Sequence, residues 1–578
     1  MVHNLRYFRQ KNSETRIFVY RKCSFLCRHW ATESRVRQTL GEDVDREAGH
    51  RLILDVFVIG GGINGCGIAR DAAGRGLSVA LAEKDDLAAA TSSASTKLFH
   101  GGLRYLEFFE FRLVREALAE RETLLKAMPH ISWPLRFVLP YHPGMRFEGN
   151  TPTSRLLRTV MPWMKGRRPA WLIRLGLFLY DNLGARQLLP GTARVDLTRG
   201  PEGAPLADKY TFGYEYSDCW VDDARLVALN ARDAAQRGAR IMTRSEVVAA
   251  RREGDLWEIE TRSSKDGTCE THLARVLVNA AGPWVGDIIA SKLPVKSSDR
   301  VRLVRGSHIV TRRLYDHDKA YFFQGSDGRI IFAIPYEQDF TLIGTTDQEH
   351  ENADLRPVCT PEEQDYLIAF ANGYFKRQLT RDDVVWTYSG VRPLHDDGAK
   401  DATAATRDYV LKVDAEGGAP VLNVFGGKIT TYRRLAESAM EKIAPYFETL
   451  RGAWTAGAPL PGGDFAVAEK PALVDALMAA YPFVDAPWAQ RLVRAYGRDA
   501  WAVLGAAKSA DDLAPDFGAT LTGAEVIWLM RHEFACTAED VVWRRTKLGL
   551  RMRDDAVAAL DQWMNNPPVA VRAAGDAA

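Results

Sequence analysis

The chain has 578 residues, 46% of them hydrophobic and 26% charged, and a formal net charge of +2. This length exceeds what one hydrophobic core supports and predicts two or three domains. The composition is typical of a globular enzyme, and the balanced charge argues against nucleic-acid binding.

The seven cysteines are scattered without a CxxC pair, and the 12 histidines form no HExxH motif. This pattern argues against a disulfide framework and against a metal site, and it indicates a reducing compartment. No apolar run approaches the roughly 18 residues that a membrane-spanning helix needs. Any membrane contact is therefore expected to lie on the surface of the protein.

A basic segment opens the chain, since residues 1–37 carry nine Lys/Arg and two acidic residues. The segment has no long apolar stretch, as a secretory signal would, and it is not clearly amphipathic, as a mitochondrial presequence would be. We expect residues 1–48 to be a disordered extension, or extra residues from a start codon placed too early.

An α/β unit is predicted from residue 52 onward. Residues 52–59 form a buried-strand pattern, residues 63–73 a helix of small residues, and residues 77–82 a second strand. The turn between the first strand and the helix reads Gly60-Gly61-Gly62-Ile63-Asn64-Gly65.

This turn fits the pattern GxGxxG. Gly60 allows the tight turn, Gly62 lets a pyrophosphate approach the backbone, and Gly65 lets the helix pack closely on the strand. The helix N-terminus then faces the phosphates. Glu83 follows the second strand about twenty residues on, where an acid accepts hydrogen bonds from the ribose. The unit therefore predicts dinucleotide binding.

The rest of the chain mixes helical and strand patterns. Helical spacing covers residues 107–128 and 221–238, and a strand pattern covers residues 240–249. Alternating residues predict an antiparallel sheet with strands at 256–261, 301–311, 330–335 and 340–346. After a Gly/Pro-rich linker, residues 471–564 favour helices. We expect two interleaved domains over residues 52–450 and a helical domain over residues 465–564.

Two further motifs favour FAD over NAD. A strand pattern ends in Ala280-Ala281-Gly282-Pro283, which resembles the second fingerprint of FAD oxidoreductases of the glutathione-reductase and amino-acid-oxidase type. The turn Gly426-Gly427-Lys428 between a strand and a helix lets backbone pass close to a flavin ring. The expected fold class is α/β: a Rossmann-like FAD-binding domain, an antiparallel-sheet substrate domain and a C-terminal helical domain.

Several longer motifs resemble those of a known protein family. They are residues 91–107 (TSSASTKLFHGGLRYLE), 305–310 (RGSHIV), 343–347 (IGTTD), 388–394 (YSGVRPL), 406–409 (TRDY), 426–428 (GGK) and 537–550 (TAEDVVWRRTKLGL). With them the chain resembles the FAD-dependent, respiratory glycerol-3-phosphate dehydrogenase family from about residue 52 to about residue 564. The resemblance implies an FAD/substrate body with a helical cap, and a homodimer.

The same resemblance implies an activity. We expect oxidation of sn-glycerol 3-phosphate to dihydroxyacetone phosphate by hydride transfer from C2 to N5 of FAD, with the electrons passed to membrane quinone. Peripheral attachment to the cytoplasmic face of the cell membrane is implied with it. Two other activities stay open: glycerol-3-phosphate oxidation with oxygen, and FAD-dependent dehydrogenation of another hydroxy acid or an amine. A non-catalytic FAD protein would not need the histidine and arginines of these motifs.

Substrate contacts are implied for five residues. The substrate phosphate is a dianion, and an arginine fork binds its oxygens bidentately. By resemblance Arg392, Arg407 and Lys428 contact the substrate, and Arg104 and Tyr105 lie near the flavin. Arg104 and Tyr105 could instead support FAD alone.

His308 is expected to take the C2 hydroxyl proton, and Arg392 to stabilise the charge that develops on the oxygen. The resemblance carries this assignment, because a lone histidine on a strand is more often a core residue. Which of these two residues acts as the base and which orients the substrate stays open.

The remaining motif residues are expected to hold FAD without a covalent bond, because no histidine or cysteine stands in an attachment motif. The expected FAD contacts are Gly60, Gly62, Gly65, Glu83, Ser92, Ser93, Thr96, Leu98, His100, Gly101, Gly102, Val247, Ala281, Gly282, Gly427, Lys428 and Thr430.

Residues 155–186 have an unusual composition. Seven Lys/Arg meet a single acidic residue, Asp181, and interleave with Trp163, Trp171 and other apolar residues. Aromatic side chains at the headgroup level together with cations for anionic lipids are typical of a segment at a membrane surface. The alternative is an inter-domain helix pair whose aromatic side chains face the core.

Overall fold

The structure, a computed structural model, describes residues 52–143, 145, 151–164, 169–184, 186–294, 299–325, 329–396 and 408–566. The expected N-terminal extension, residues 1–48, and the expected substrate contact Arg407 lie outside the described residues.

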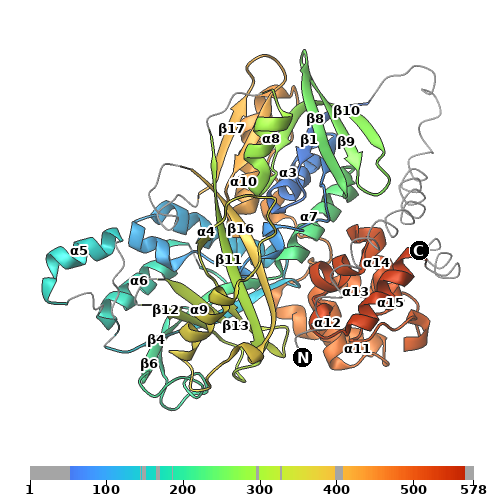
Figure 1. The fold of residues 1–578 in the computed structure, drawn as a ribbon. Helices are drawn as coiled ribbons and strands as arrows, with labels where there is room; N and C mark the ends of the chain where they lie inside the picture. Colours follow the sequence, from blue (N-terminus) through green and yellow to red (C-terminus); the bar gives the residue numbers. More distant parts are fainter. Residues whose placement is uncertain are drawn as a thin grey trace, which may run out of the picture.

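The first of two sheets (Figure 1) is mainly parallel. Its strands are β1 (Ile53–Ile59), β2 (Val79–Ala82), β7 (Arg240–Met242), β8 (Ser245–Glu253), β9 (Leu256–Ser263), β10 (Cys269–Asn279), β17 (Val410–Asp414) and β18 (Val421–Phe425). The order is β17-β18-β10-β1-β2-β7, parallel from β18 to β7, and β8 and β9 extend from β10 as an antiparallel hairpin.

Helices cover one face of this sheet. They are α3 (Ile63–Gly74), α7 (Asp223–Gln236) and α10 (Tyr432–Ile443). The other face packs against α8 (Val285–Lys292) and the β8–β9 hairpin. Because both faces are buried, residues 56–59 of β1 form a continuous apolar run instead of alternating, and Val56, Phe57 and Val58 are all fully buried.

The second sheet is antiparallel except for the β4–β12 pair. Its strands are β3 (Leu98–Phe99), β4 (Ser132–Tyr141), β5 (Ala193–Asp196), β6 (Phe212–Val221), β11 (Val301–Arg312), β12 (Ala320–Gln324), β13 (Ile330–Tyr336), β14 (Phe340–Gly344), β15 (Gln348–Glu349) and β16 (Val384–His395). The order is β15-β11-β14-β13-β12-β4-β6-β3, with β16 paired along β11 and β5 along β6.

The C-terminal residues form a separate helical bundle beside the sheets (Figure 1). It contains α11 (Lys470–Ala480), α12 (Ala486–Tyr496), α13 (Ala500–Leu504), α14 (Gly523–Glu533), a π-helix (Asp540–Arg545) and α15 (Asp554–Asn565). The bundle has its own apolar core, so the expected fold class, including a C-terminal helical domain, is confirmed.

Three expectations about strands differ from the structure. The pattern at residues 240–249 is two strands, because Arg244 adopts a left-handed φ of 55° and the chain turns from β7 into the β8–β9 hairpin. The strand at residues 256–261 therefore belongs to the first sheet. β4 was not anticipated because Pro134 and Pro140 are typical of edge strands or breaks, yet it pairs along β6.

Residues 155–186 contribute to α5 (Pro152–Val160) and α6 (Ala170–Leu183), which project from the body near α4 (Phe111–Ala127) in Figure 1. Leu177 and Tyr180 are buried, whereas Trp163 and Trp171 are 70% and 58% exposed. The core-facing interpretation is therefore wrong for the two tryptophans. Within the described part of the chain, no helix combines the length and apolarity needed to cross a membrane.

Candidate active site

A cavity of about 1250 Å³ is lined by residues of both sheets and of the C-terminal helical bundle. The residues that follow β1, β2, β10 and β18 all line it. The carboxyl ends of parallel strands are where open α/β sheets bind their ligands, because adjacent turns diverge there and leave a crevice.

The GxGxxG turn forms one wall of the cavity. A Cβ added to Gly65 would lie 1.9 Å from the carbonyl oxygen of Gly60, so only glycine lets α3 approach β1 this closely. Gly60 has a left-handed φ of 108°, which the tight turn requires. The first turn of α3 holds no acidic residue, so nothing there repels a pyrophosphate at the helix N-terminus.

Glu83 is held in place by backbone N–H groups. Gly61 donates to its Oε2 at 2.7 Å and Asp85 donates to its Oε1 at 2.8 Å. Burial raises the pKa of Glu83, and these two backbone bonds oppose that shift. The carboxyl group lines the cavity next to the GxGxxG turn, where a ribose would lie.

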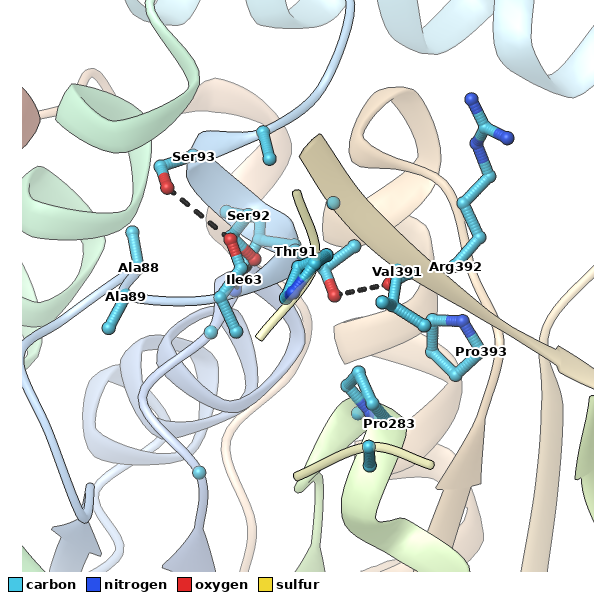
Figure 2. Close-up of a pocket in the computed structure, with 18 of the residues that line it drawn as sticks. Ile63, Ala88, Ala89, Thr91, Ser92, Ser93, Pro283, Val391, Arg392 and Pro393 are labelled. Carbon is cyan, nitrogen blue, oxygen red and sulfur yellow. Dashed lines mark hydrogen bonds between the residues drawn. The ribbon is translucent and has the colours of Figure 1, made fainter. Parts of the chain in front are cut away.

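The Ser/Thr-rich segment joins the two sheets. The hydroxyl of Thr91 donates to the carbonyl oxygen of Val391 on β16 at 2.6 Å, as Figure 2 shows, and Ser92 Oγ accepts from the Ile63 N–H at 3.0 Å. At the end of the segment, the buried Lys97 Nζ lies 2.7 Å from Asp223 Oδ1 on α7. These contacts fix the segment across the cavity.

A buried network shapes the His-Gly-Gly turn. The Gly101 N–H donates to the Tyr180 hydroxyl at 2.7 Å, and that hydroxyl bonds Asp218 Oδ1 at 2.8 Å. Arg121 Nη1 donates to the same carboxylate at 2.5 Å. The His100 N–H donates to Thr430 Oγ1 at 3.2 Å, which ties this turn to the turn after β18.

The turn after β18 supplies a cation. Gly426 and Gly427 have left-handed φ values of 68° and 99°, and Asn64 Nδ2 donates to the Gly426 carbonyl at 3.1 Å. Lys428 Nζ lies 3.8 Å from the centroid of the Tyr105 ring, and both residues line the cavity. A lysine and an aromatic ring therefore face the same space.

His308 lies on β11 and is 1% exposed. Its ring stacks on Tyr388 of β16, with centroids 4.7 Å apart and an interplanar angle of 12°. Nε2 lies 3.0 Å from Thr96 Oγ1, and Nδ1 has no hydrogen-bond partner among the residues described. The pKa of His308 lies well below 6.5, mainly because the ring is buried and secondarily because Arg392 and Lys97 are nearby. The imidazole is therefore neutral and can accept a proton.

Arg392 lies on β16 and lines the cavity (Figure 2). Its Nη1 donates to Asp347 Oδ1 at 2.5 Å and its Nη2 to Thr345 Oγ1 at 3.1 Å. A Cβ added to Gly306 would lie 2.3 Å from Nη2, so this glycine makes room for the guanidinium. A cation and a neutral base therefore stand on adjacent strands.

Most residues expected from the sequence line this one cavity. Those that do are Gly60, Gly62, Glu83, Ser92, Ser93, Thr96, Leu98, His100, Tyr105, Val247, Ala281, Gly282, Arg392, Gly427, Lys428 and Thr430. Gly65, Gly101 and Gly102 shape the turns behind the wall. Arg104 and His308 are not among the described residues that line it, although their neighbours Tyr105 and Thr96 are.

Several residues of the site were not predicted from the sequence. Asp347 and Tyr388 lie within motifs that it quoted, but their pairing with Arg392 and His308 follows from strand register. Asn64 occupies a variable position of GxGxxG and carried no signal of its own. Trp543 and Lys547 lie in the quoted motif 537–550, but nothing in that motif indicated that they reach the cavity from the C-terminal bundle.

The cavity fits FAD. The Oδ1 atom of Asn64 is buried, and within the described chain it has no hydrogen-bond partner, so it can accept a bond from a ligand. The acid-free N-terminus of α3 suits a pyrophosphate, Glu83 suits a ribose, and the Gly426-Gly427 turn passes close to the space beside Lys428.

Replacing Gly62 by valine is expected to give a soluble protein without FAD. A Cβ at Gly62 would lie 3.3 Å from Ser92 Oγ, so the Ser92 side chain must shift by a few tenths of an ångström, and the new side chain occupies the place of the pyrophosphate. Flavin absorbance per protein measures the result. Gly286→Val is the control, because a Cβ there meets only Val301 at 3.9 Å and lies outside the cavity lining. Normal flavin content in Gly62→Val would contradict the phosphate assignment.

Comparison with known families agrees with this geometry. Residues 55–433 match the family described as FAD dependent oxidoreductase, and residues 453–565 match the C-terminal domain of alpha-glycerophosphate oxidase. A solved structure of glycerol-3-phosphate dehydrogenase from Bacillus halodurans, complexed with FAD, is 26% identical with a TM-score of 0.65, covering 88% of each chain. Together with the cavity, these matches identify FAD as the cofactor.

Curated relatives cover almost the whole described chain. D-erythritol 1-phosphate dehydrogenase of Brucella abortus is 52% identical over 512 residues, 89% of this chain and 98% of that protein. Glycerol-3-phosphate dehydrogenase of Pseudomonas aeruginosa is 48% identical over 515 residues, 89% and 95%. Aerobic glycerol-3-phosphate dehydrogenase of Escherichia coli is 46% identical over 511 residues, 88% and 97%. The chain belongs to the FAD-dependent oxidoreductase family and, within it, to the glycerol-3-phosphate dehydrogenase group.

Proposed function

We propose that this protein oxidises sn-glycerol 3-phosphate to dihydroxyacetone phosphate and passes the electrons to membrane quinone. The observation that carries the proposal is the grouping of two cations, Arg392 and Lys428, in one cavity whose wall includes Thr96, the hydrogen-bond partner of the neutral, buried His308. A phosphate dianion needs fixed cations, and a secondary alcohol that loses hydride needs a base for its proton.

Each residue has a distinct task in this proposal. Lys428 and Arg392 bind the phosphate and the C2 oxygen, and Arg104, Tyr105 and Arg407 remain further predicted contacts. Thr96 lines the cavity and its hydroxyl lies 3.0 Å from His308 Nε2, so the C2 proton can pass through this hydroxyl to the imidazole. Bound FAD supplies the two-electron acceptor at N5 for the hydride that leaves C2.

Anaerobic mixing of the purified holoenzyme with glycerol 3-phosphate tests the reaction. Bleaching of the oxidised flavin spectrum, with dihydroxyacetone phosphate as product, is expected, and an unchanged spectrum would overturn the proposal. Steady-state turnover with a quinone analogue is then compared with turnover in dissolved oxygen. Faster turnover with oxygen would make the protein an oxidase.

A four-carbon polyol phosphate is the second candidate substrate. The observation that favours it is the 52% identity to the D-erythritol 1-phosphate dehydrogenase of Brucella abortus. Such a substrate presents the same phosphate to Arg392 and Lys428 and adds a hydroxylated carbon at the other end. Comparing kcat/KM for the two substrates decides between them, because their ratio reports the difference in transition-state binding alone. A higher value for D-erythritol 1-phosphate would replace glycerol 3-phosphate in the proposal.

A quinone acceptor lies in the bilayer, so the protein must dock there. We place the docking surface on α5, α6 and residues 161–163, and the membrane side at the cytoplasmic face. Leu156, Val160 and Phe178 are 54%, 59% and 60% exposed there, in addition to the two tryptophans. Exposed aromatic and aliphatic side chains beside cations are typical of a lipid-facing surface.

Exchanging Trp163 and Trp171 together for serine is expected to move the enzyme from the membrane to the soluble fraction while dye-linked activity survives. Both side chains project into solvent, so their loss removes apolar contact with lipid and leaves the core intact. Flotation with anionic vesicles measures the change. Val385→Ser with Tyr446→Ser is the control, since these side chains are 42% and 38% exposed on other elements.

Two other results would redirect this assignment. A double variant that still floats with vesicles would place the membrane contact elsewhere. A double variant that becomes monomeric in analytical ultracentrifugation, while wild type is a dimer, would make this surface the interface of the predicted homodimer instead.

A further inference from the structure

Four aromatic rings, called the stack below, are in continuous contact from His308 to the C-terminal bundle, as two stacked pairs joined by one tilted contact. His308 stacks on Tyr388, with centroids 4.7 Å apart and an interplanar angle of 12°. The Tyr388 and Trp386 rings are tilted by 39° with centroids 5.1 Å apart, and Trp386 stacks on Trp543 with centroids 4.6 Å apart and an interplanar angle of 13°. Tyr388, Trp386 and Trp543 all line the cavity. The bundle thus touches the candidate base through two intermediate rings.

Trp543 lies in the π-helix Asp540–Arg545. A π-helix is rarer and less stable than an α-helix because its hydrogen bonds span five residues, and it persists mainly where function requires it. Here the wider turn coincides with the point where Trp543 and Arg544 reach the cavity. The helix is therefore part of the wall of the active site as well as part of the bundle.

Buried ion pairs fix this π-helix to the FAD-binding sheet. Arg545 Nη1 and Nη2 each lie 2.8 Å from a carboxylate oxygen of Asp86, and Arg544 Nε lies 2.5 Å from the same carboxylate. Arg244 Nη2 lies 2.8 Å from Asp540 Oδ2. Asp86 is 2% exposed and stands on the loop between β2 and the Ser/Thr-rich cavity segment. The outer end of the aromatic stack is consequently rigid.

We propose that Trp543 is a positioning residue for the reaction: through Trp386 and Tyr388, the C-terminal helical bundle sets the orientation and burial of the His308 imidazole. The proposal rests on the proposed function, because it takes His308 as the proton acceptor. Among the described residues, one hydrogen bond holds the imidazole, that between Nε2 and Thr96 Oγ1, so the plane of the ring depends on the stack.

The groups around His308 determine how its pKa responds to the loss of Trp543. Arg392 on β16 and Lys97, which is paired with Asp223, are the nearby charges, and Tyr388 covers the ring. Burial is the main reason that the pKa of His308 lies well below 6.5. Removing Trp543 opens the stack to water, so the pKa of His308 rises toward its ordinary value. Because the reaction needs the neutral imidazole, the acidic fall in rate then moves to higher pH.

The test compares Trp543→Leu and Trp543→Phe with Trp563→Leu as the matched control. Trp563 also packs partly buried against the core of the bundle, where its ring contacts Phe517 at 5.4 Å, but it does not line the cavity. The readout is the rate constant of anaerobic flavin reduction by glycerol 3-phosphate as a function of pH. FAD content and substrate affinity are measured on the same samples.

We expect the flavin of Trp543→Leu to be reduced at least about tenfold more slowly than that of wild type near neutral pH. Small misplacements of a catalytic group lower the rate by that much or more. The acidic limb of its pH–rate profile should move to higher pH, and its substrate affinity should change little. Trp543→Phe should restore most of both properties because it retains a ring. Trp563→Leu should keep the wild-type profile.

An unchanged pH profile in Trp543→Leu, or an equal shift in Trp563→Leu, would overturn the positioning role. If Trp543→Leu does not accumulate as a flavoprotein, Trp386→Leu interrupts the same stack and must show the shift. Loss of FAD from both variants would mean that the stack holds the cofactor instead, which also contradicts the proposal. A wild-type protein that glycerol 3-phosphate does not reduce would refute the proposed function, a result distinct from all of these.

Discussion

Replacing His308 by asparagine is expected to slow flavin reduction by about 10²- to 10⁴-fold, the usual contribution of a general base. FAD should stay bound, because His308 is not among the described residues that line the cavity. Asparagine ends near the position of Nδ1, so it does not reach Thr96 as Nε2 does, and it cannot take a proton. In wild type the rate should hold down to pH values well below 6.5, because the depressed pKa keeps the imidazole neutral there and the rate falls only as pH drops through that pKa.

Stopped-flow reduction under anaerobic conditions measures this effect. His272→Asn is the matched control, since His272 is also a buried strand histidine whose Nε2 lies 2.9 Å from a threonine hydroxyl, that of Thr261. It lies outside the cavity lining and should leave the reduction rate unchanged. Near-normal reduction by His308→Asn would assign the base to another group and leave His308 as a core residue.

Replacing Arg392 by alanine is expected to lower kcat/KM by roughly 30- to 5000-fold, which corresponds to about 2–5 kcal/mol for the loss of a desolvated charge-assisted pair. FAD content should be normal, because the guanidinium contacts Asp347 and Thr345 in the loop after β14 of the second sheet. Glycerol, which lacks the phosphate, should be a poor substrate for wild type and for the variant alike.

Arg305→Ala controls for the loss of one positive charge nearby. Arg305 lies on β11 and pairs with Glu363 at 3.0 Å, outside the lining of the cavity. It should change kcat/KM little. If Arg392→Ala turned over normally, the phosphate would have to bind elsewhere in the cavity, with Lys428 as the first position to replace.

The FAD-binding unit could be predicted because its signals are local. β1, the GxGxxG turn, α3, β2 and Glu83 follow one another within a short stretch, and each glycine has a steric reason that spacing alone reveals. The prediction of FAD and of the fold class is confirmed. The β7–β8 break was not predictable, since a left-handed φ at Arg244 leaves no mark in an alternating pattern.

The candidate site depends on contacts between distant parts of the chain. Lys97 meets Asp223, Thr91 meets Val391, and Tyr388 meets His308 only after the strands have paired in register. A pattern read along one segment cannot specify such a register across two sheets. For the same reason the resemblance implied a base, a cation and an FAD contact at Thr96, but not the hydrogen bond between Thr96 and His308.

The sequence by itself determined the cofactor class, the order of the FAD motifs and the presence of a helical C-terminal region, because backbone sterics and periodicity act over a few residues. Only the tertiary structure decided that Trp163 and Trp171 face solvent, that Arg392 pairs with Asp347, and that Trp543 reaches the active site. Those properties depend on which surfaces exclude water from each other, and burial is a property of the packed chain.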